Sequence, residues 1–338
     1  DYLLTNDPLN NKSAYIYTDA IKLSDLTSYE GFSNDFFGKV TVATGFAGDS
    51  TNVGSNSTES NGTPRFVKLV EGTKGLIGGD SGYATTTENK NAALIGTAAE
   101  RTGIHALDDD GLNISMAVVP GINDDSVQNE LITLAESSKN FLALVSPPLG
   151  LTNVQSAVDW INGKGARTGS LNSSYAAAYW PWVQVFNGFA GAEQWYDPAI
   201  YAARQCVYTD SVSEPWFAPA GFRRGRLTKP TDVEIAVNQG DRNTMYANAL
   251  NPISKEPQTG ITVFGQKTTQ RAPTALDRVN VRRLMIYIRK VLLQLGAPFQ
   301  FEPNDQFTWE QVEDAITPFL ADLRARRAVV ESAVRCDS

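Results

Sequence analysis

Short apolar runs alternate with amphipathic stretches through the middle of the chain. The runs at residues 114–119, 141–145 and 175–186 are mostly apolar, which is typical of strands buried on both faces of a sheet. The stretches at residues 127–135 and 154–161 repeat apolar side chains every three or four positions, as amphipathic helices do. This order of strand, helix, strand, helix and strand predicts an α/β domain with a parallel sheet covered by helices on both faces.

Polar residues indicate where several helices begin. Asp124 stands near the start of the first helix, where the helix dipole favours negative charge. Thr152 with Gln155, and Thr308 with Gln311, have the spacing of capping boxes. We therefore expect helices to begin beside each of these pairs.

The last third of the chain predicts an α+β arrangement. A strand is expected at residues 261–268, followed by a long helix at 276–295 and a short strand at 299–302. A closing helix follows, in which Pro318 predicts a kink or a fresh helix start.

The long helix has an apolar face and a basic face. The apolar face contains Val281, Leu284, Met285, Ile288, Leu292 and Leu295. The basic side contains Arg278, Arg282, Arg283, Arg289 and Lys290, and the later segment Asp322–Arg327 adds Arg324, Arg326 and Arg327. Such charges are usually solvated, but they are also candidates for contact with an acidic partner surface.

Composition divides the chain into three regions. Residues 1–68 are rich in small and polar side chains, and we expect a β-rich or incomplete module there. Residues 69–270 hold the α/β domain, and residues 271–338 form a smaller C-terminal α+β domain. The chain begins at Asp1 and not at Met, so we expect a processed or trimmed piece of a protein.

Charge and composition exclude some classes of partner. The net charge of −8 argues against nucleic acid, and no apolar run approaches the length of a membrane span. Cys206 and Cys336 are too few for a disulfide framework and lack metal-ligand spacing, so we expect free thiols and a reducing compartment.

The segment Gly79-Asp80-Ser81-Gly82 raises the question of a nucleophilic serine. A serine hydrolase needs a base, and His105 is the chain's single histidine. The order of serine, histidine and then aspartate, within a short stretch ending at 108–110, matches none of the familiar triads. A glycine-permitted turn is the favoured interpretation, and a hydrolase using Ser81 and His105 is kept as an alternative.

Other ligand classes find little support. No phosphate-binding glycine motif occurs, and the Asp108–Gly111 run lacks the spacing of a calcium loop, so no cofactor or metal is expected. The aromatic residues suggest either a carbohydrate-binding platform or a core with subunit contacts, and the second is favoured. They are Tyr179, Trp180, Trp182, Phe186, Trp195, Tyr196, Trp216 and Phe217.

Several segments, taken together and in order, carry a family resemblance. They are residues 75–82, 174–182, 217–227, 263–268, 276–292, 301–305, 308–309 and 334–337. Over residues 75–338 the sequence resembles the contractile tail sheath proteins of myophages. It departs from the family pattern where Ser81 occupies the place of an aspartate, and where the usual Pro-Pro-Ser-Gly element is missing between Trp182 and Trp216.

The resemblance implies a structural protein and not an enzyme. Residues 69–270 would form a subtilisin-like α/β domain without a triad, so that Ser81 is a turn residue. Subunits of this family stack in sixfold rings around the tail tube and contract to drive the tube through the host envelope. The implied partners are other sheath subunits, the tail tube protein, the baseplate and the tail terminator, in a virion assembled in the host cytoplasm.

Two expectations complete this interpretation. Terminal arms in the family add strands to a neighbour's sheet, and their apparent absence predicts a mostly monomeric fragment. A surface adhesin that binds carbohydrate through the aromatic residues between Trp180 and Trp216 remains the alternative from another class.

Overall fold

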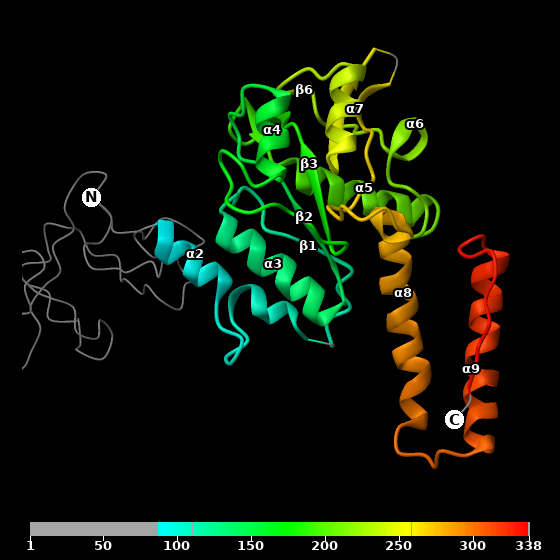
Figure 1. Cartoon of the computed structure of the whole chain (residues 1–338). Helices are drawn as coiled ribbons and strands as arrows, with labels where there is room; N and C mark the ends of the chain where they lie inside the picture. The colour runs from blue at the N-terminus through cyan, green and yellow to red at the C-terminus, as the bar shows by residue number, and fades with distance from the viewer. Residues whose placement is uncertain (1–86, 110, 258, 337–338) are drawn as a thin grey trace, which may run out of the picture. The chain divides into compact units, whose positions relative to one another are not determined.

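A sheet of five strands, in the order β1-β2-β3-β7-β8, forms the centre of the computed structural model (Figure 1). The strands are β1 (Met116–Val118), β2 (Leu142–Val145), β3 (Ala176–Trp180), β7 (Leu250–Glu256) and β8 (Gly260–Val263). The first four run parallel, and β8 pairs antiparallel with β7. The structure describes residues 87–109, 111–257 and 259–336, so the module expected at 1–68 and the turn at Ser81 lie outside the described residues.

The predicted alternation of strands and helices is confirmed. Helix α3 (Asp125–Ser138) connects β1 to β2, and α4 (Val154–Ile161) connects β2 to β3. The side chain of Asp124 caps α3 by accepting the Ser126 N–H. The capping box expected at Thr152 is wrong, because the neighbouring Asn153 is the N-cap residue of α4 and accepts the Ser156 N–H.

Helices cover both faces of the sheet. Along β3, Ala176, Ala178 and Trp180 belong to the core on the side of α3, α4 and α7 (Gln239–Ala247). Ala177 and Tyr179 belong to the opposite core, which includes side chains of α5 (Pro198–Val212) and α8 (Val279–Gly296). Successive side chains of a strand point to opposite faces, so an apolar strand supplies two cores at once.

Residues 175–186, predicted as one strand, form two strands that belong to different sheets, and the second sheet is antiparallel. It contains β4 (Val183–Asn187), β5 (Ala192–Tyr196) and β6 (Asp232–Val233), in the order β5-β4-β6. β3 ends at Trp180, and the next residue, Pro181, has no N–H to donate to a strand ladder. The chain therefore leaves the central sheet at the proline and joins the small sheet.

The remaining elements are short helices and one long C-terminal pair. They are α2 (Thr87–Ile95), η3 (Gly103–Leu107), α6 (Gly221–Arg224), η4 (Ala275–Asp277), η5 (Ala297–Phe299) and α9 (Gln306–Ala325). Figure 1 shows α8 and α9 as an antiparallel hairpin that extends beyond the sheet. Among the described residues, no helix has the length and hydropathy needed to cross a membrane.

Three predictions for the C-terminal region are wrong. Residues 299–302 form no strand, because the chain turns there and Phe301 has a left-handed φ of 77°. Helix α9 begins after an Asp305 N-cap and not at a Thr308 capping box. Of the two alternatives expected at Pro318, the fresh helix start is wrong, because α9 continues through this position. Pro318 and Asp314, one turn earlier, are exposed, so water can satisfy the freed carbonyl.

Candidate functional site

The arginines expected on a solvated face of α8 lie in the interior. Arg282 is buried, donates to the Ser174 hydroxyl and places its guanidinium 4.0 Å from the centre of the Tyr175 ring. Burial lowers the pKa of Arg282. Arg283 is also buried and forms an ion pair of 2.5 Å with Asp210. The prediction that these two side chains are available to a partner is therefore wrong for this conformation of the chain.

The next two basic side chains of α8 also bind within the chain. Arg289 donates to the Ser138 carbonyl over 3.5 Å, at the C-terminal end of α3. Lys290 donates to the Asn113 side chain over 3.2 Å and to the Ile114 carbonyl. Partial burial lowers the pKa of Lys290. These contacts attach α8 to the α/β domain, and the Ser138 carbonyl is one of the last carbonyls of α3, which lack partners within the helix.

The arginines near the end of α9 are more accessible. Arg326 pairs with Glu214 and lies 3.3 Å from Asp322, and its guanidinium is 5.2 Å from the Trp216 ring centre. These acceptors, Glu214 first, raise the pKa of Arg326. Arg324 and Arg327 are exposed, and no ion pair with either is found within the described part of the chain.

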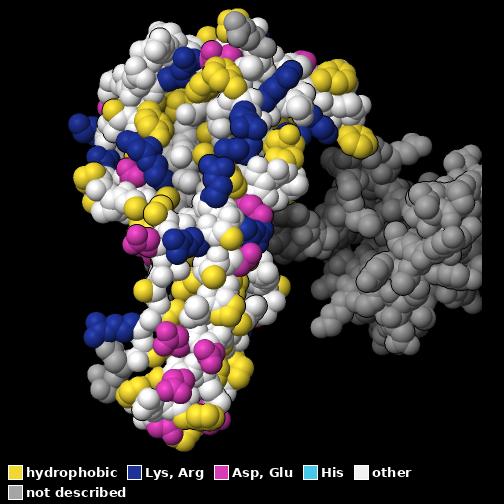
Figure 2. All heavy atoms as spheres, turned by 90° about the vertical axis from the view of Figure 1, so that its right-hand side faces the viewer, with side chains coloured by type: hydrophobic (Ala, Val, Ile, Leu, Met, Phe, Trp, Pro, Cys, Tyr) yellow, Lys and Arg dark blue, Asp and Glu magenta, His cyan; other side chains and the backbone are white. Residues whose placement is uncertain are grey.

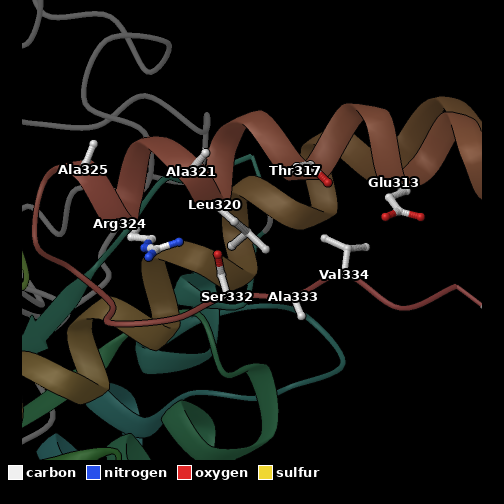
Figure 3. A pocket seen from close by; sticks show the side chains of 9 residues that line it. All are labelled: Glu313, Thr317, Leu320, Ala321, Arg324, Ala325, Ser332, Ala333 and Val334. Atoms are coloured by element: carbon white, nitrogen blue, oxygen red, sulfur yellow. The ribbon is translucent and has the colours of Figure 1, made fainter.

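A groove lies between α9 and the extended chain that follows it (Figure 3). Its volume is about 740 Å³. Glu313, Thr317, Leu320, Ala321, Arg324 and Ala325 line it from α9, and Ser332, Ala333 and Val334 line it from the chain after the helix. Arg324 and Leu320 point toward Ser332 in Figure 3. The groove thus has a cation toward one end and the Glu313 carboxylate toward the other.

A small apolar cluster attaches α9 to the rest of the chain. Leu323 is fully buried and packs with Trp216 and Leu284. The Trp216 indole N–H also donates to the Arg326 carbonyl over 3.2 Å. Tyr287 and Phe319 add a ring contact of 6.2 Å between centroids. The role of Trp216 as the partner of Leu323 had no sequence signal.

The polar residues considered for catalysis have ordinary surroundings. The His105 imidazole lies 3.3 Å from the Glu130 carboxylate of α3. Asp109 accepts the Gly111 N–H over 2.8 Å, as in a turn. Across the described ranges, no group of three or more His, Cys, Asp or Glu residues has the arrangement of a metal site. The candidate nucleophile Ser81 lies outside the described residues, so the structure shows only the His105 and Asp109 side of this alternative.

The aromatic residues divide between core and surface. Tyr179 and Trp180 are fully buried, and the Trp182 indole donates to the Pro147 carbonyl over 2.9 Å. These rings cannot face a sugar, so a carbohydrate platform built on them is wrong. Phe186 and Trp195 remain exposed on the β4–β5 hairpin.

Both cysteines are free thiols, as the sequence predicts. Cys206 lies in the core beside α8, and burial raises its pKa to about 11. Cys336 is half-buried in the chain after α9. A thiol held protonated in the core is inert, which fits a structural role for Cys206.

Comparison with known proteins supplies the family context. The model of the phage tail sheath protein central domain matches residues 84–269. The tail sheath protein of Enterobacteria phage T4 is 27% identical over 223 residues, which are 63% of this chain and 34% of that protein. The tail sheath protein of Vibrio phage KVP40 is 29% identical over 58% of this chain and 31% of its own length. The chain thus spans about a third of the length of these relatives.

Solved structures share the fold. The helical sheath of the anti-feeding prophage in its contracted state has a TM-score of 0.54 and 23% identity, over 71% of this chain and 63% of that one. The sheath complex of the PVC extracellular contractile injection system, also contracted, has a TM-score of 0.56 and 22% identity, over 69% and 62%. At this level of identity the likeness concerns the architecture of the α/β domain.

Proposed function

The chain belongs to the phage tail sheath protein family, and we propose that it forms the central part of a contractile tail sheath subunit. Its family consists of structural proteins and not of enzymes. Copies stack in sixfold rings around the tail tube of a virion or an injection particle. The rings rearrange from a long, narrow state to a short, wide one, and this contraction drives the tube through the host envelope.

The observation that carries this proposal is the family match across the whole α/β domain. It extends over residues 84–269, close to the domain expected at 69–270. Residues 271–338 then form the C-terminal sheath domain, in which the α8–α9 hairpin is the main described feature. The subtilisin-like shape is an architecture only, a parallel sheet between helices.

A rigid subunit fits a sheath that contracts by changing the contacts between its subunits. Arg282, Arg283, Arg289 and Lys290 all bind groups of the α/β domain or of the segments around it. Helix α8 therefore moves together with the sheet, and the rings rearrange through contacts between rigid bodies. The tube, the baseplate and the tail terminator are the further partners of the assembly.

Arg324 and Arg327, with Arg326 beside them, are the cations we assign to an acidic surface of the tube or of an adjacent subunit. Arg324 and Arg327 are exposed, so their charges can pair with a partner without breaking an internal contact. Reversing both (Arg324→Glu with Arg327→Glu) should abolish the incorporation of subunits into tails. Lys164→Glu, at another exposed cation, is the matched control and should leave incorporation unchanged.

The chain by itself is proposed to be mostly monomeric at micromolar concentrations. Terminal arms that link neighbours by strand addition are the family's strong connections, whereas contacts between the exposed charged surfaces of the described residues are individually weak and screened by salt. Gel filtration at high salt should give one peak at the monomer position. Stable rings in that experiment would refute this part of the proposal.

Immunogold electron microscopy tests the sheath assignment. Antibodies against the folded chain should label contractile particles along the full length of the tail. Label confined to fibres at the particle's end would instead indicate an adhesin, and particles without label on the tail would reject a sheath subunit.

A further inference from the structure

The tip of the α8–α9 hairpin exposes large apolar side chains among carboxylates. Leu293, Phe301 and Phe307 are 54%, 95% and 67% exposed around the loop that joins the two helices. The surrounding acidic residues, all exposed, are Glu302, Asp305, Glu310, Glu313 and Asp314. Residues 291–323 contain no lysine or arginine at all. We call these eight side chains the acidic tip.

A second surface of the chain has the opposite charge around an exposed ring. Phe222 on α6 is 59% exposed, and its ring contacts Phe264 edge-on with centroids 5.2 Å apart. The cations around it are the exposed Arg204, Arg223, Arg226 and Lys229. We call these four cations with Phe222 the basic surface.

Contacts between the segments hold the basic surface together. Arg204 on α5 donates to the Thr228 hydroxyl over 3.1 Å, next to Lys229. The adjacent Gln205 donates to the carbonyl of Arg224, the last residue of α6. Arg226 forms a β-bridge with Thr262 of β8. These cations therefore lie on neighbouring segments of one face.

Carboxylates on the same segments do not neutralise the basic surface. Asp210 pairs with Arg283, and Glu214 pairs with Arg326. Among the described residues, no ion pair involves any of the four cations. In Figure 2 most of the Lys and Arg side chains on this face lie over the α/β domain, whereas the lower part of the α8–α9 hairpin shows mainly Asp and Glu.

We propose that the acidic tip of one copy docks on the basic surface of the next copy of this chain. Each surface has an exposed aromatic centre and a charged rim, which is the usual anatomy of a protein interface. Burial of Phe301 and Phe307 against Phe222 provides the attraction, and the opposite charges fix orientation and register. This inference rests on the proposed function, in which copies meet in a sheath.

The geometry of the contact has a consequence for assembly. The two surfaces differ, so the contact is heterologous and leaves each copy with one unused surface of each kind. Contacts of this type extend as rings or helices and do not stop at a dimer. Since the charges are exposed, the contact should weaken as salt rises.

Two complementary variants test the docking. The tip variant carries Glu310→Lys, Glu313→Lys and Asp314→Lys, and the face variant carries Arg204→Glu, Arg223→Glu and Arg226→Glu. All six positions are exposed, so both variants should keep the fold, which circular dichroism checks. Sedimentation velocity is measured over a concentration series at low and at high salt, for each protein alone and for the equimolar mixture.

The wild-type chain should associate weakly at low salt, without stopping at a dimer, and dissociate at high salt. Either variant alone should have a dissociation constant raised about tenfold or more, since three surface ion pairs are reversed. The mixture should again associate beyond a dimer, because the intact basic surface of the tip variant can bind the intact tip of the face variant, and the reversed tip and the reversed basic surface carry opposite charges as well.

Three results would overturn the docking. The first is a wild-type chain that stays monomeric at every concentration at low salt, and the second is a variant that associates as the wild type does. The third is wild-type association that ends at a symmetric dimer, which would show an isologous contact. All three leave the sheath proposal standing, because immunogold labelling of the tail tests it separately.

Discussion

Replacement of Arg283 by methionine should destabilise the chain by about 2–3 kcal/mol. The side chain is 3% exposed, pairs with Asp210 over 2.5 Å and donates to the Pro215 carbonyl over 3.3 Å. Loss of one partner of a fully buried ion pair costs about 3–5 kcal/mol, because the other charge is left uncompensated. Asp210 is 31% exposed, so water can rehydrate its carboxylate and the cost falls below that range.

Urea unfolding followed by circular dichroism measures this free energy. Asp210→Asn and the double variant complete a cycle that isolates the coupling between the two side chains, which we expect to be about 1–2 kcal/mol. The matched control is Arg324→Met on exposed α9, which should change stability by no more than about 0.5 kcal/mol. Equal effects at Arg283 and Arg324 would refute the internal role of Arg283.

Further predictions concern α9, a helix cap and the thiols. Leu323→Ala should lower the free energy of unfolding by about 2–4 kcal/mol in the same urea assay, because it leaves a cavity beside Trp216 and Leu284. Leu293→Ala, at an exposed site, should change it little. Equal losses for the two variants would contradict the packing of α9. Asp124→Ala should cost about 1 kcal/mol. The Ser126 hydrogen bond lowers the pKa of Asp124, so its contribution is present above the unfolded pKa and lost as pH falls through the folded pKa. Asp124→Asn should remove that acid dependence, and an unchanged pH profile would reject the cap. Iodoacetamide should modify Cys336 in the folded chain and Cys206 only after unfolding, as mass spectrometry would show.

The α/β domain was predictable because its strands carry a strong local pattern. β2 and β3 are uninterrupted apolar runs, and the helices between them repeat apolar residues with helical spacing. The cap of α4 was misplaced by one residue because Thr152 and Asn153 are both good caps, and sequence spacing alone does not decide between them.

The basic side of α8 was misjudged because this helix packs on two sides. Val279 and Ile286 contact the core beside the sheet, whereas Leu284 and Tyr287 contact α9 and Trp216. Arg282 and Arg283 are buried between these contacts with partners distant in sequence, which no local pattern reveals. Met285, predicted to face inward, is 45% exposed for the same reason.

A count of acidic and basic residues over 271–338 does not reveal that the charges are separated on the surface. The arginines of α8 and of the α9 end offset the carboxylates of the hairpin in sequence. In the structure the α8 arginines are internal, so the tip of the hairpin remains acidic at its surface. Folding, by burying selected charges, produces surfaces that composition does not show.

Helical reconstruction of the tail by electron cryomicroscopy is the most direct test of the sheath assignment. Contractile particles from the source of this sequence would be imaged before and after contraction. The account predicts sixfold rings of subunits around a tube, with the α/β domain and α8 fitting each subunit's density as one rigid body in both states. A sheath whose density cannot accommodate this sheet and its flanking helices would contradict it.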